Sequence, residues 1–132
     1  MTNQQLLAKA KSAMQNAYAP YSGFLVGAAL LCADGTIYTG CNIENASFSV
    51  TNCAERTALF KAISDGKRQF CAIAVVGGHG GVCSDFAMPC GVCRQAFSEF
   101  CDNDLRIILG TNDGRIKEYT LGALLPDTFA LK

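Results

Sequence analysis

The chain has 132 residues, half of them apolar, and its eleven basic residues balance eleven acidic ones. This length suits one domain over residues 1–132, with a core that needs no disulfide bonds for stability. Because phosphate binding normally requires an excess of positive charge, the balanced charge argues against a nucleic-acid partner and favours a small, roughly neutral ligand.

The N-terminal part of the chain predicts one helix and a strand hairpin. A capping-box pattern at Thr2 and Gln5 precedes apolar residues at helical spacing, and this helix should end before Pro20. Residues 24–32 and 37–41 are predicted as antiparallel strands, because an Asp-Gly pair between them favours a hairpin turn.

The middle of the chain predicts a second helix and a central strand. Asn52 can cap a helix over residues 53–65, which places Cys53 in the first helical turn. Residues 70–76 are rich in β-branched and apolar side chains and are predicted as a buried strand, followed by a glycine-rich loop over 77–81.

The C-terminal part predicts a third helix and a second hairpin. The helix should begin at Pro89 and Cys90. Its inner side is expected to carry four apolar residues, Val92, Ala96, Phe97 and Phe100. Residues 105–109 read as a buried strand, and the short turn after it requires an antiparallel return along 116–119. A last turn of helix is expected over 121–125.

This order of elements predicts an α/β fold. The economical arrangement is a three-layer α/β/α sandwich, in which helices cover both faces of a five-stranded mixed sheet whose last strand is antiparallel. Two strand-to-helix junctions then lie side by side, and each delivers cysteines from a helix N-terminus, where the helix dipole favours thiolate over thiol.

Eight cysteines in so short a chain would indicate a disulfide framework in a secreted protein. Residues 1–5 carry no positive charge and no long apolar stretch follows, so we expect no secretory signal, no membrane anchor and a soluble, cytoplasmic protein with free thiols. Cys32, Cys71 and Cys101 lie in apolar runs and are expected to be small buried side chains.

Three other cysteines predict a metal site. Cys90 and Cys93 have the spacing of a metal-ligand pair on one helical turn, and Cys53 adds a third thiol at another helix start. Three thiols can close three corners of a zinc tetrahedron and leave the fourth open. Glu55 lies two residues after the first thiol, and we interpret its carboxylate as the proton carrier that an open zinc site needs.

Three alternatives remain open at this point. Glu55 could simply complete a helix cap. Cys83 or Cys101 could provide a fourth ligand and make the zinc purely structural. A thiol oxidoreductase would use Cys90 and Cys93 as a redox pair and would need no zinc.

The residues around these thiols carry a family resemblance. Residues 53–58, Cys-Ala-Glu-Arg-Thr-Ala, and 89–95, Pro-Cys-Gly-Val-Cys-Arg-Gln, resemble the two signatures of zinc-dependent cytidine deaminases, in their three-cysteine variant. Residues 18–22, 40–45 and 124–126 resemble the small, homotetrameric branch of that family, so the likeness covers nearly the whole length.

The resemblance implies hydrolytic deamination of cytidine and deoxycytidine to uridine and deoxyuridine plus ammonia, in pyrimidine salvage. One Zn²⁺ per subunit would be held by Cys53, Cys90 and Cys93, and would lower the pKa of water towards about 7. Glu55 would take the released proton, pass it to ring N3, and later carry a proton to the departing amino group. The alternatives are a deaminase of a cytosine-nucleoside antibiotic and a non-catalytic zinc-binding module.

The resemblance also implies the substrate contacts. Asn42 and Glu44 match positions that hold ribose hydroxyls, and Phe24 matches an aromatic of the base pocket. The backbone of Ala54 would meet the cytosine edge. Phe129 matches an aromatic that enters a neighbouring subunit's pocket, so the active sites of the homotetramer would be shared between subunits.

Arg56 is expected to tune the metal. Three thiolates around one zinc leave a net negative charge, which weakens the metal as a Lewis acid, and hydrogen bonds from Arg56 to the sulfurs would offset this. The alternative is an exposed helix arginine. Phe48 stands where relatives commonly carry tyrosine, and His79 in the glycine-rich loop is expected to face solvent and receives no role.

Overall fold

Five strands form one sheet in the computed structural model, which describes residues 1–131. The strands are β1 (Phe24–Cys32), β2 (Ile37–Cys41), β3 (Phe70–His79), β4 (Arg106–Gly110) and β5 (Ile116–Thr120). They lie in the order β2-β1-β3-β4-β5. Only β3 and β4 pair in parallel, and the other neighbours are antiparallel. The predicted mixed sheet and the antiparallel last strand are confirmed.

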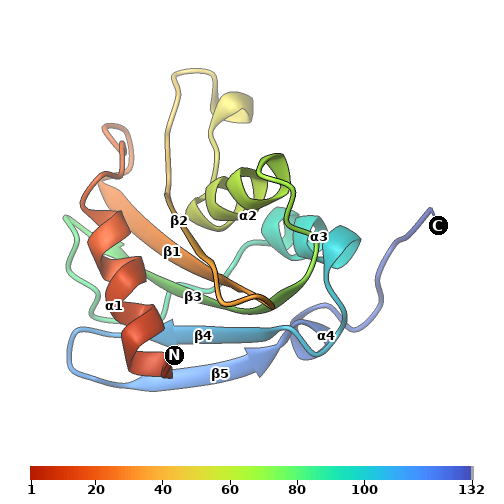
Figure 1. The fold of residues 1–132 in the computed structure, drawn as a ribbon. Helices are drawn as coiled ribbons and strands as arrows, with labels where there is room; N and C mark the ends of the chain where they lie inside the picture. Colours follow the sequence, from red (N-terminus) through yellow and green to blue (C-terminus); the bar gives the residue numbers. More distant parts are fainter. Residues whose placement is uncertain (132) are drawn as a thin grey trace.

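Helices cover both faces of this sheet (Figure 1). The N-terminal helix α1 (Asn3–Met14) lies on one face, while α2 (Ala54–Ser64) and α3 (Gly91–Phe100) lie together on the other. A 3-10 turn η1 (Phe48–Val50) and a short helix α4 (Leu121–Leu124) complete the helical elements of the described residues. The predicted three-layer α/β/α sandwich is therefore confirmed.

Helix α1 begins as the sequence predicts and lies directly on β1. Thr2 Oγ1 accepts a hydrogen bond from Gln5 N at 3.1 Å, and Gln5 Oε1 accepts one from Thr2 N at 2.8 Å, so both halves of the capping box are present. A Cβ atom added at Gly27 would lie 2.0 Å from Ala10 O and 2.6 Å from Met14 N. Only glycine allows the helix backbone to approach the strand this closely.

The opposite layer shows the same close approach at Gly40 of β2. A Cβ atom there would lie 2.5 Å from Ala54 O and 2.6 Å from Ala58 N, both in the N-terminal half of α2. The helix ends at Ser64, and Gly66 after its C-cap has φ 89°, as the predicted stop requires. Contact between the backbones of β2 and α2 therefore fixes the first turn of α2, where Cys53 and Glu55 lie.

Strand β3 is longer than predicted. Gly77 and Gly78, expected in a loop, continue the antiparallel pairing with β1, and His79 is the last strand residue. A Cβ atom at Gly78 would lie 1.8 Å from the Val82 carbonyl oxygen, so this glycine serves close packing instead of a turn. The chain turns only at Gly80 and the glycine after it, where φ becomes positive.

The predicted cap of α2 is wrong by one residue. Cys53 is the N-cap, with extended backbone angles and no side-chain capping bond. Asn52 instead lies in an isolated bridge with Ile43, and its Nδ2 donates to Thr57 Oγ1 at 3.0 Å. The Asn52 side chain therefore links the preceding loop to the first turn of α2, and the Cys53 thiol forms no capping hydrogen bond.

Two burial predictions are also wrong. Val92 is 60% exposed, because Cys93 and Phe97 define the buried side of α3 and each residue turns about 100° around a helix axis. The other three residues predicted on the inner side are buried or partly buried. Cys71, the second residue of β3, is exposed. Cys32 is buried and Cys101 partly buried, and all eight cysteines are free.

β4 begins at Arg106 and α4 ends at Leu124, each one residue from its predicted boundary. α1 ends at Met14, before Pro20 as predicted but several residues short of it. After α4 the chain runs past α3 and away from the sheet without a further element up to residue 131 (Figure 1). No helix within residues 1–131 combines the length and apolar character needed to cross a membrane.

Candidate metal centre and adjoining cavity

Three thiols meet between the N-termini of α2 and α3. Cys53 is the N-cap of α2, Cys90 is the N-cap of α3, and Cys93 lies in the first turn of α3. Cys53 Sγ lies 3.8 Å from Cys90 Sγ, and Cys90 Sγ lies 3.5 Å from Cys93 Sγ. All three sulfurs lie within 4.8 Å of one another. The fold therefore brings together the three cysteines that the sequence singled out.

The geometry of this cluster fits zinc. Zn–S bonds of ~2.3 Å in a tetrahedral arrangement place two sulfurs about 3.8 Å apart. The Cys53–Cys90 and Cys90–Cys93 pairs, at 3.8 and 3.5 Å, agree with that separation. Thiolates are also the soft donors that zinc accepts readily.

A fourth protein ligand does not join the three thiols. Of the described residues, only these three cysteines form a metal-binding group of His, Cys, Asp or Glu side chains. Cys83 is buried on the α1 side of the sheet, where its thiol lies 3.6 Å from Met14 Sδ. Cys101 follows the last residue of α3, at the opposite end of that helix from the cluster. The cluster thus offers three protein ligands, the number that catalytic zinc sites use.

Hydrogen bonds favour a thiolate in this cluster. A hydrogen bond from the Cys93 thiol is the largest cause that lowers the pKa of Cys53 to about 5. Burial opposes this shift, and Arg56 adds to it. The same hydrogen bond with Cys53, followed by burial, raises the pKa of Cys93. Arg56 Nη2 donates to Cys53 Sγ at 3.3 Å, and its guanidinium is partly buried instead of solvent-exposed. Its Nε is buried and has no partner among the described residues.

Glu55 is buried beside the cluster. It is the second residue of α2, is 4% exposed, and takes no part in a capping box, so the structure does not support a purely capping role. Burial is the largest cause that raises the pKa of this carboxyl to about 7. A carboxyl group that titrates near neutral pH can both accept and release a proton, as general acid–base catalysis requires.

A cavity of about 320 Å³ opens beside the three thiols and Glu55. Its lining includes the predicted contacts Phe24, Asn42 and Ala54, together with Cys53, Glu55 and Cys90. Thr51 and Phe86 are among the lining residues that were not predicted from the sequence. Both lie in loops, where no periodic spacing indicates which side chains face a cavity. For Phe86, the only signal in the sequence was an aromatic residue shortly before the second cysteine motif.

The two predicted ribose-binding side chains are already held by the chain. Asn42 Oδ1 accepts from Val26 N at 2.9 Å, and Asn42 Nδ2 donates to Phe24 O at 2.8 Å. Glu44 does not line the cavity, and its Oε1 accepts from Tyr21 N at 3.0 Å. Hydrogen bonds from Ser22 lower the pKa of Glu44, so this carboxylate stays ionised. Each group keeps spare hydrogen-bonding capacity for a ligand.

Phe129 lies on the C-terminal segment, where 70% of its surface is exposed. Gln95 Nε2 of α3 donates to Phe129 O at 3.0 Å, which holds the backbone while the ring remains exposed. Phe48 is 74% exposed and packs edge-on against Tyr21, with ring centroids 6.3 Å apart. Neither ring lines the cavity of its own chain.

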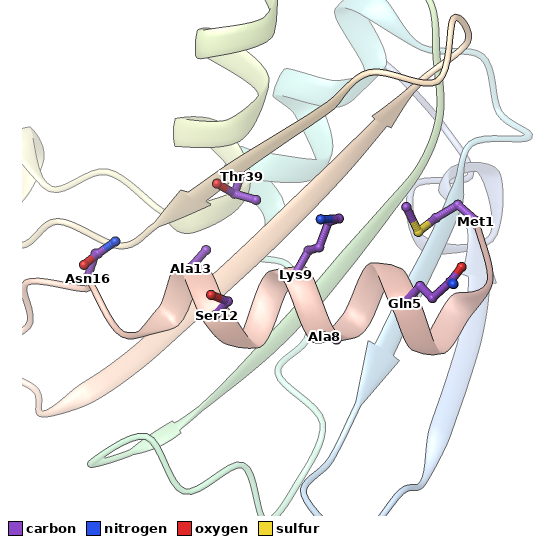
Figure 2. Close-up of a pocket in the computed structure, with 8 residues that line it drawn as sticks. All are labelled: Met1, Gln5, Ala8, Lys9, Ser12, Ala13, Asn16 and Thr39. Atoms are coloured by element: carbon purple, nitrogen blue, oxygen red, sulfur yellow. The ribbon is translucent and has the colours of Figure 1, made fainter.

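A larger hollow, of about 580 Å³, lies away from the thiols along the outer side of α1 (Figure 2). Its lining comes from α1 and its flanking residues, together with Thr39 of β2. Lys9 is the one charged side chain among these residues, and none of them is a cysteine or a carboxylate. This hollow therefore lacks the groups needed for metal binding or proton transfer.

The fold and the site together define a class of protein: an α/β sandwich that holds an open three-thiol metal site and a buried carboxyl between two helix N-termini. The family model described as "Cytidine and deoxycytidylate deaminase zinc-binding region" matches residues 1–110. The chain belongs to this family of zinc-dependent deaminases.

Curated relatives match over almost the full chain. A cytidine deaminase of Sporosarcina psychrophila is 53% identical over 130 residues, covering 98% of this chain and 93% of that protein. A cytidine deaminase of Halalkalibacterium halodurans is 50% identical over 129 residues, covering 98% of this chain and 95% of that protein.

Solved structures agree in fold. The crystal structure of cytidine deaminase from Burkholderia pseudomallei superposes with a TM-score of 0.90 at 48% identity, covering 98% of this chain and 100% of that one. The cytidine deaminase of Mycobacterium tuberculosis gives a TM-score of 0.84 at 40% identity, covering 99% of both chains.

Proposed function

We propose that the protein catalyses the hydrolytic deamination of cytidine and deoxycytidine, which yields uridine or deoxyuridine and ammonia. The observation that carries this proposal is the buried Glu55 carboxyl, placed in the same cavity as an open three-thiol site. Relatives named cytidine deaminase, at 53% and 50% identity, support the same reaction and make the protein a hydrolase of a cyclic amidine C–N bond.

Each step needs a proton moved by this chain. Cys53, Cys90 and Cys93 would hold a zinc ion, which would lower the pKa of water so that it can lose a proton near neutral pH. Glu55 then accepts a proton from the attacking water and delivers it to ring N3, which makes C4 electrophilic. The same carboxyl finally takes the proton of the new C4 hydroxyl and carries it to the amino group, which leaves as ammonia while C4 becomes a carbonyl. A pKa of about 7 suits a group that serves first as base and then as acid.

The cavity walls would orient the nucleoside. Phe24 supplies an apolar face for the base, and the backbone of Ala54 lies at the cavity surface for the cytosine edge. Asn42 keeps one donor and one acceptor site for a ribose hydroxyl, and Glu44 would complete the ribose contact from outside the lining. A cavity of about 320 Å³ suits a single nucleoside better than a polynucleotide.

The proposed functional unit is a homotetramer of one-domain subunits spanning residues 1–132. Phe48, Val50 and Phe129 are each more than 60% exposed, and exposed apolar side chains of this size are typical of subunit contacts. Phe129 would enter a neighbouring subunit's cavity. Free thiols and a thiolate metal site suit a reducing compartment, so we place the protein in the cytoplasm, in pyrimidine salvage.

The test is the loss of cytidine absorbance with purified, zinc-loaded protein, with deoxycytidine and aminoacyl-cytosine nucleosides as competing substrates. The Glu55→Gln variant should keep one zinc per subunit and lose about 10²- to 10⁴-fold in turnover, the usual contribution of a general acid–base. Glu99→Gln, an exposed glutamate of α3, is the matched control and should keep wild-type turnover. Full turnover in Glu55→Gln, or a preference for the aminoacyl nucleosides, would contradict the proposal.

A further inference from the structure

Phe86, in the loop between β3 and α3, borders two cavities. One is the candidate substrate cavity of about 320 Å³. The other, of about 330 Å³, is lined by residues of the β3 end and the following loop, among them His79 and Asp85. Phe24 and Phe86 are the residues common to both linings. The two rings therefore separate the substrate cavity from its neighbour.

Both rings of this partition are contacted by polar side chains. The Phe24 ring packs edge-on against His79, with ring centroids 5.1 Å apart. The Phe86 ring lies below two cations, with Arg115 Cζ 5.3 Å and Lys117 Nζ 5.0 Å from its centroid. Such cation–π contacts attract a ring electrostatically and restrict its position.

The two cations come from the β4–β5 hairpin, which contributes no residue to the substrate cavity. Arg115 Nη2 also donates to Ser84 O at 2.7 Å, two residues before Phe86. Arg115 therefore contacts both the ring and the backbone that leads to it. Lys117, on β5, contacts the ring from a strand whose position the sheet fixes. The hairpin thus braces one wall of the cavity from outside.

We propose that Phe86 is a specificity-determining wall of the substrate cavity, and that Arg115 and Lys117 are positioning residues that act on the substrate only through its ring. The proposal rests on the proposed nucleoside deaminase function. Glu55 and the three thiols lie on α2 and α3, so displacement of the Phe86 ring leaves them in place. The hairpin cations should consequently affect substrate binding, measured as KM, and not kcat.

The test is a double-mutant cycle between Lys117→Met and Phe86→Leu. Lys117→Met should raise KM for cytidine about two- to fivefold, the usual worth of an exposed cation–π contact, with kcat unchanged. Lys117→Arg should restore KM, because it keeps the cation. In the Phe86→Leu background, Lys117→Met should have no further effect. Lys9→Met, an exposed lysine of α1, is the matched control and should leave KM unchanged.

Two results would overturn the proposal. One is an unchanged KM in Lys117→Met, a surface variant whose folding is checked by its melting temperature. The other is an equal effect of Lys117→Met with and without the Phe86 ring, which would mean that the charge acts directly on the substrate. Titration of uridine, the product, by calorimetry measures the same differences in Kd without turnover. Binding of uridine by a wild-type protein that does not deaminate cytidine would refute the proposed function alone.

Discussion

Asn42 Nδ2 donates a 2.8 Å hydrogen bond to the Phe24 carbonyl, and this contact links the end of β2 to the start of β1. Asn42 directly follows β2, and its Oδ1 also accepts from Val26 N at 2.9 Å. The Asn42 carboxamide thus takes the place of a backbone N–H and a backbone carbonyl in the pairing of β2 with β1, next to the cavity. A residue predicted for ribose binding also positions an aromatic wall.

Substitution of Asn42 should therefore affect stability as well as binding. Asn42→Ala leaves the Val26 N–H and the Phe24 carbonyl unpaired in a partly buried place, which should cost about 1–3 kcal/mol in the free energy of unfolding. Urea titration measures this loss, and KM for cytidine should rise in parallel. Asn16→Ala, at an exposed position after α1, is the control. Unchanged stability of Asn42→Ala would show that water replaces both bonds.

Arg56 should affect turnover although it does not line the substrate cavity. Its Nη2 lies 3.3 Å from Cys53 Sγ and draws charge from a ligand sulfur. Arg56→Met should lower kcat by roughly 10- to 100-fold, the usual effect of removing a group that supports a metal ligand. Arg56→Lys should recover only part, because an ammonium lacks the planar fork of donors. Wild-type kcat and wild-type zinc affinity in Arg56→Met would refute this role.

Gly40 should tolerate no side chain. Because a Cβ atom there would meet the α2 backbone at 2.5 Å, Gly40→Ala must push the first turn of α2 outward. We expect a loss of about 1–3 kcal/mol or more in unfolding free energy. Zinc affinity, measured by competition with a chromogenic chelator, should also fall because the displaced turn carries Cys53. Gly91→Ala is the matched control, since a Cβ atom at Gly91 meets nothing within 4 Å.

A surface network joins α1 to the last two strands and predicts a pH effect. Arg106 Nη2 donates to Glu118 Oε1 at 3.0 Å, and Asn3 Nδ2 donates to the same oxygen at 3.0 Å. Hydrogen bonds from Arg106 and then Asn3 hold the pKa of Glu118 below its ordinary value of 4.5. The folded state thus favours ionised Glu118, and this stabilisation is present above that value and lost as the pH falls below it.

Glu118→Gln should therefore reduce stability by about 0.5 kcal/mol at pH 7, since both charged partners are more than a third exposed. The difference from wild type should vanish at low pH, where the wild-type carboxyl is protonated. Melting curves of both proteins between pH 7 and pH 3 provide the measurement. A difference that stays constant over that range would show that Glu118 stabilises the fold by packing alone.

The pairing of Cys90 with Cys93 could be predicted because their spacing is local. Cys53, 37 residues before Cys90, could be added because the predicted α/β topology places two helix N-termini side by side. Cys53, Cys90 and Cys93 meet as expected. The strand boundaries also followed from local patterns, namely the alternation of apolar and polar residues and the position of turn residues. Phe86 could not be predicted as a cavity wall, because its place depends on a hairpin about 30 residues later in the chain.

Errors arose where one residue type serves two purposes. Gly77 and Gly78 were predicted as a loop because glycine favours turns, yet they lie in β3, where glycine permits close packing instead. Asparagine is frequent at helix N-caps, but the Asn52 side chain donates a hydrogen bond to Thr57, and Cys53 occupies the N-cap position. Close packing against other segments decided the outcome for the two glycines, and a side-chain hydrogen bond five residues along the chain decided it for Asn52.

The N-caps of α2 and α3 have a consequence for the life of the protein in a cell. Cys53 and Cys90 occupy positions where serine, threonine or aspartate usually satisfies the first amide groups, and neither forms a capping bond. Bonds from Cys53 and Cys90 to a zinc ion would therefore add order to both helix starts, and the binding energy would contribute to folding energy. Under metal starvation the chain would fray at these two ends and become a protease target, so its abundance would follow the zinc supply.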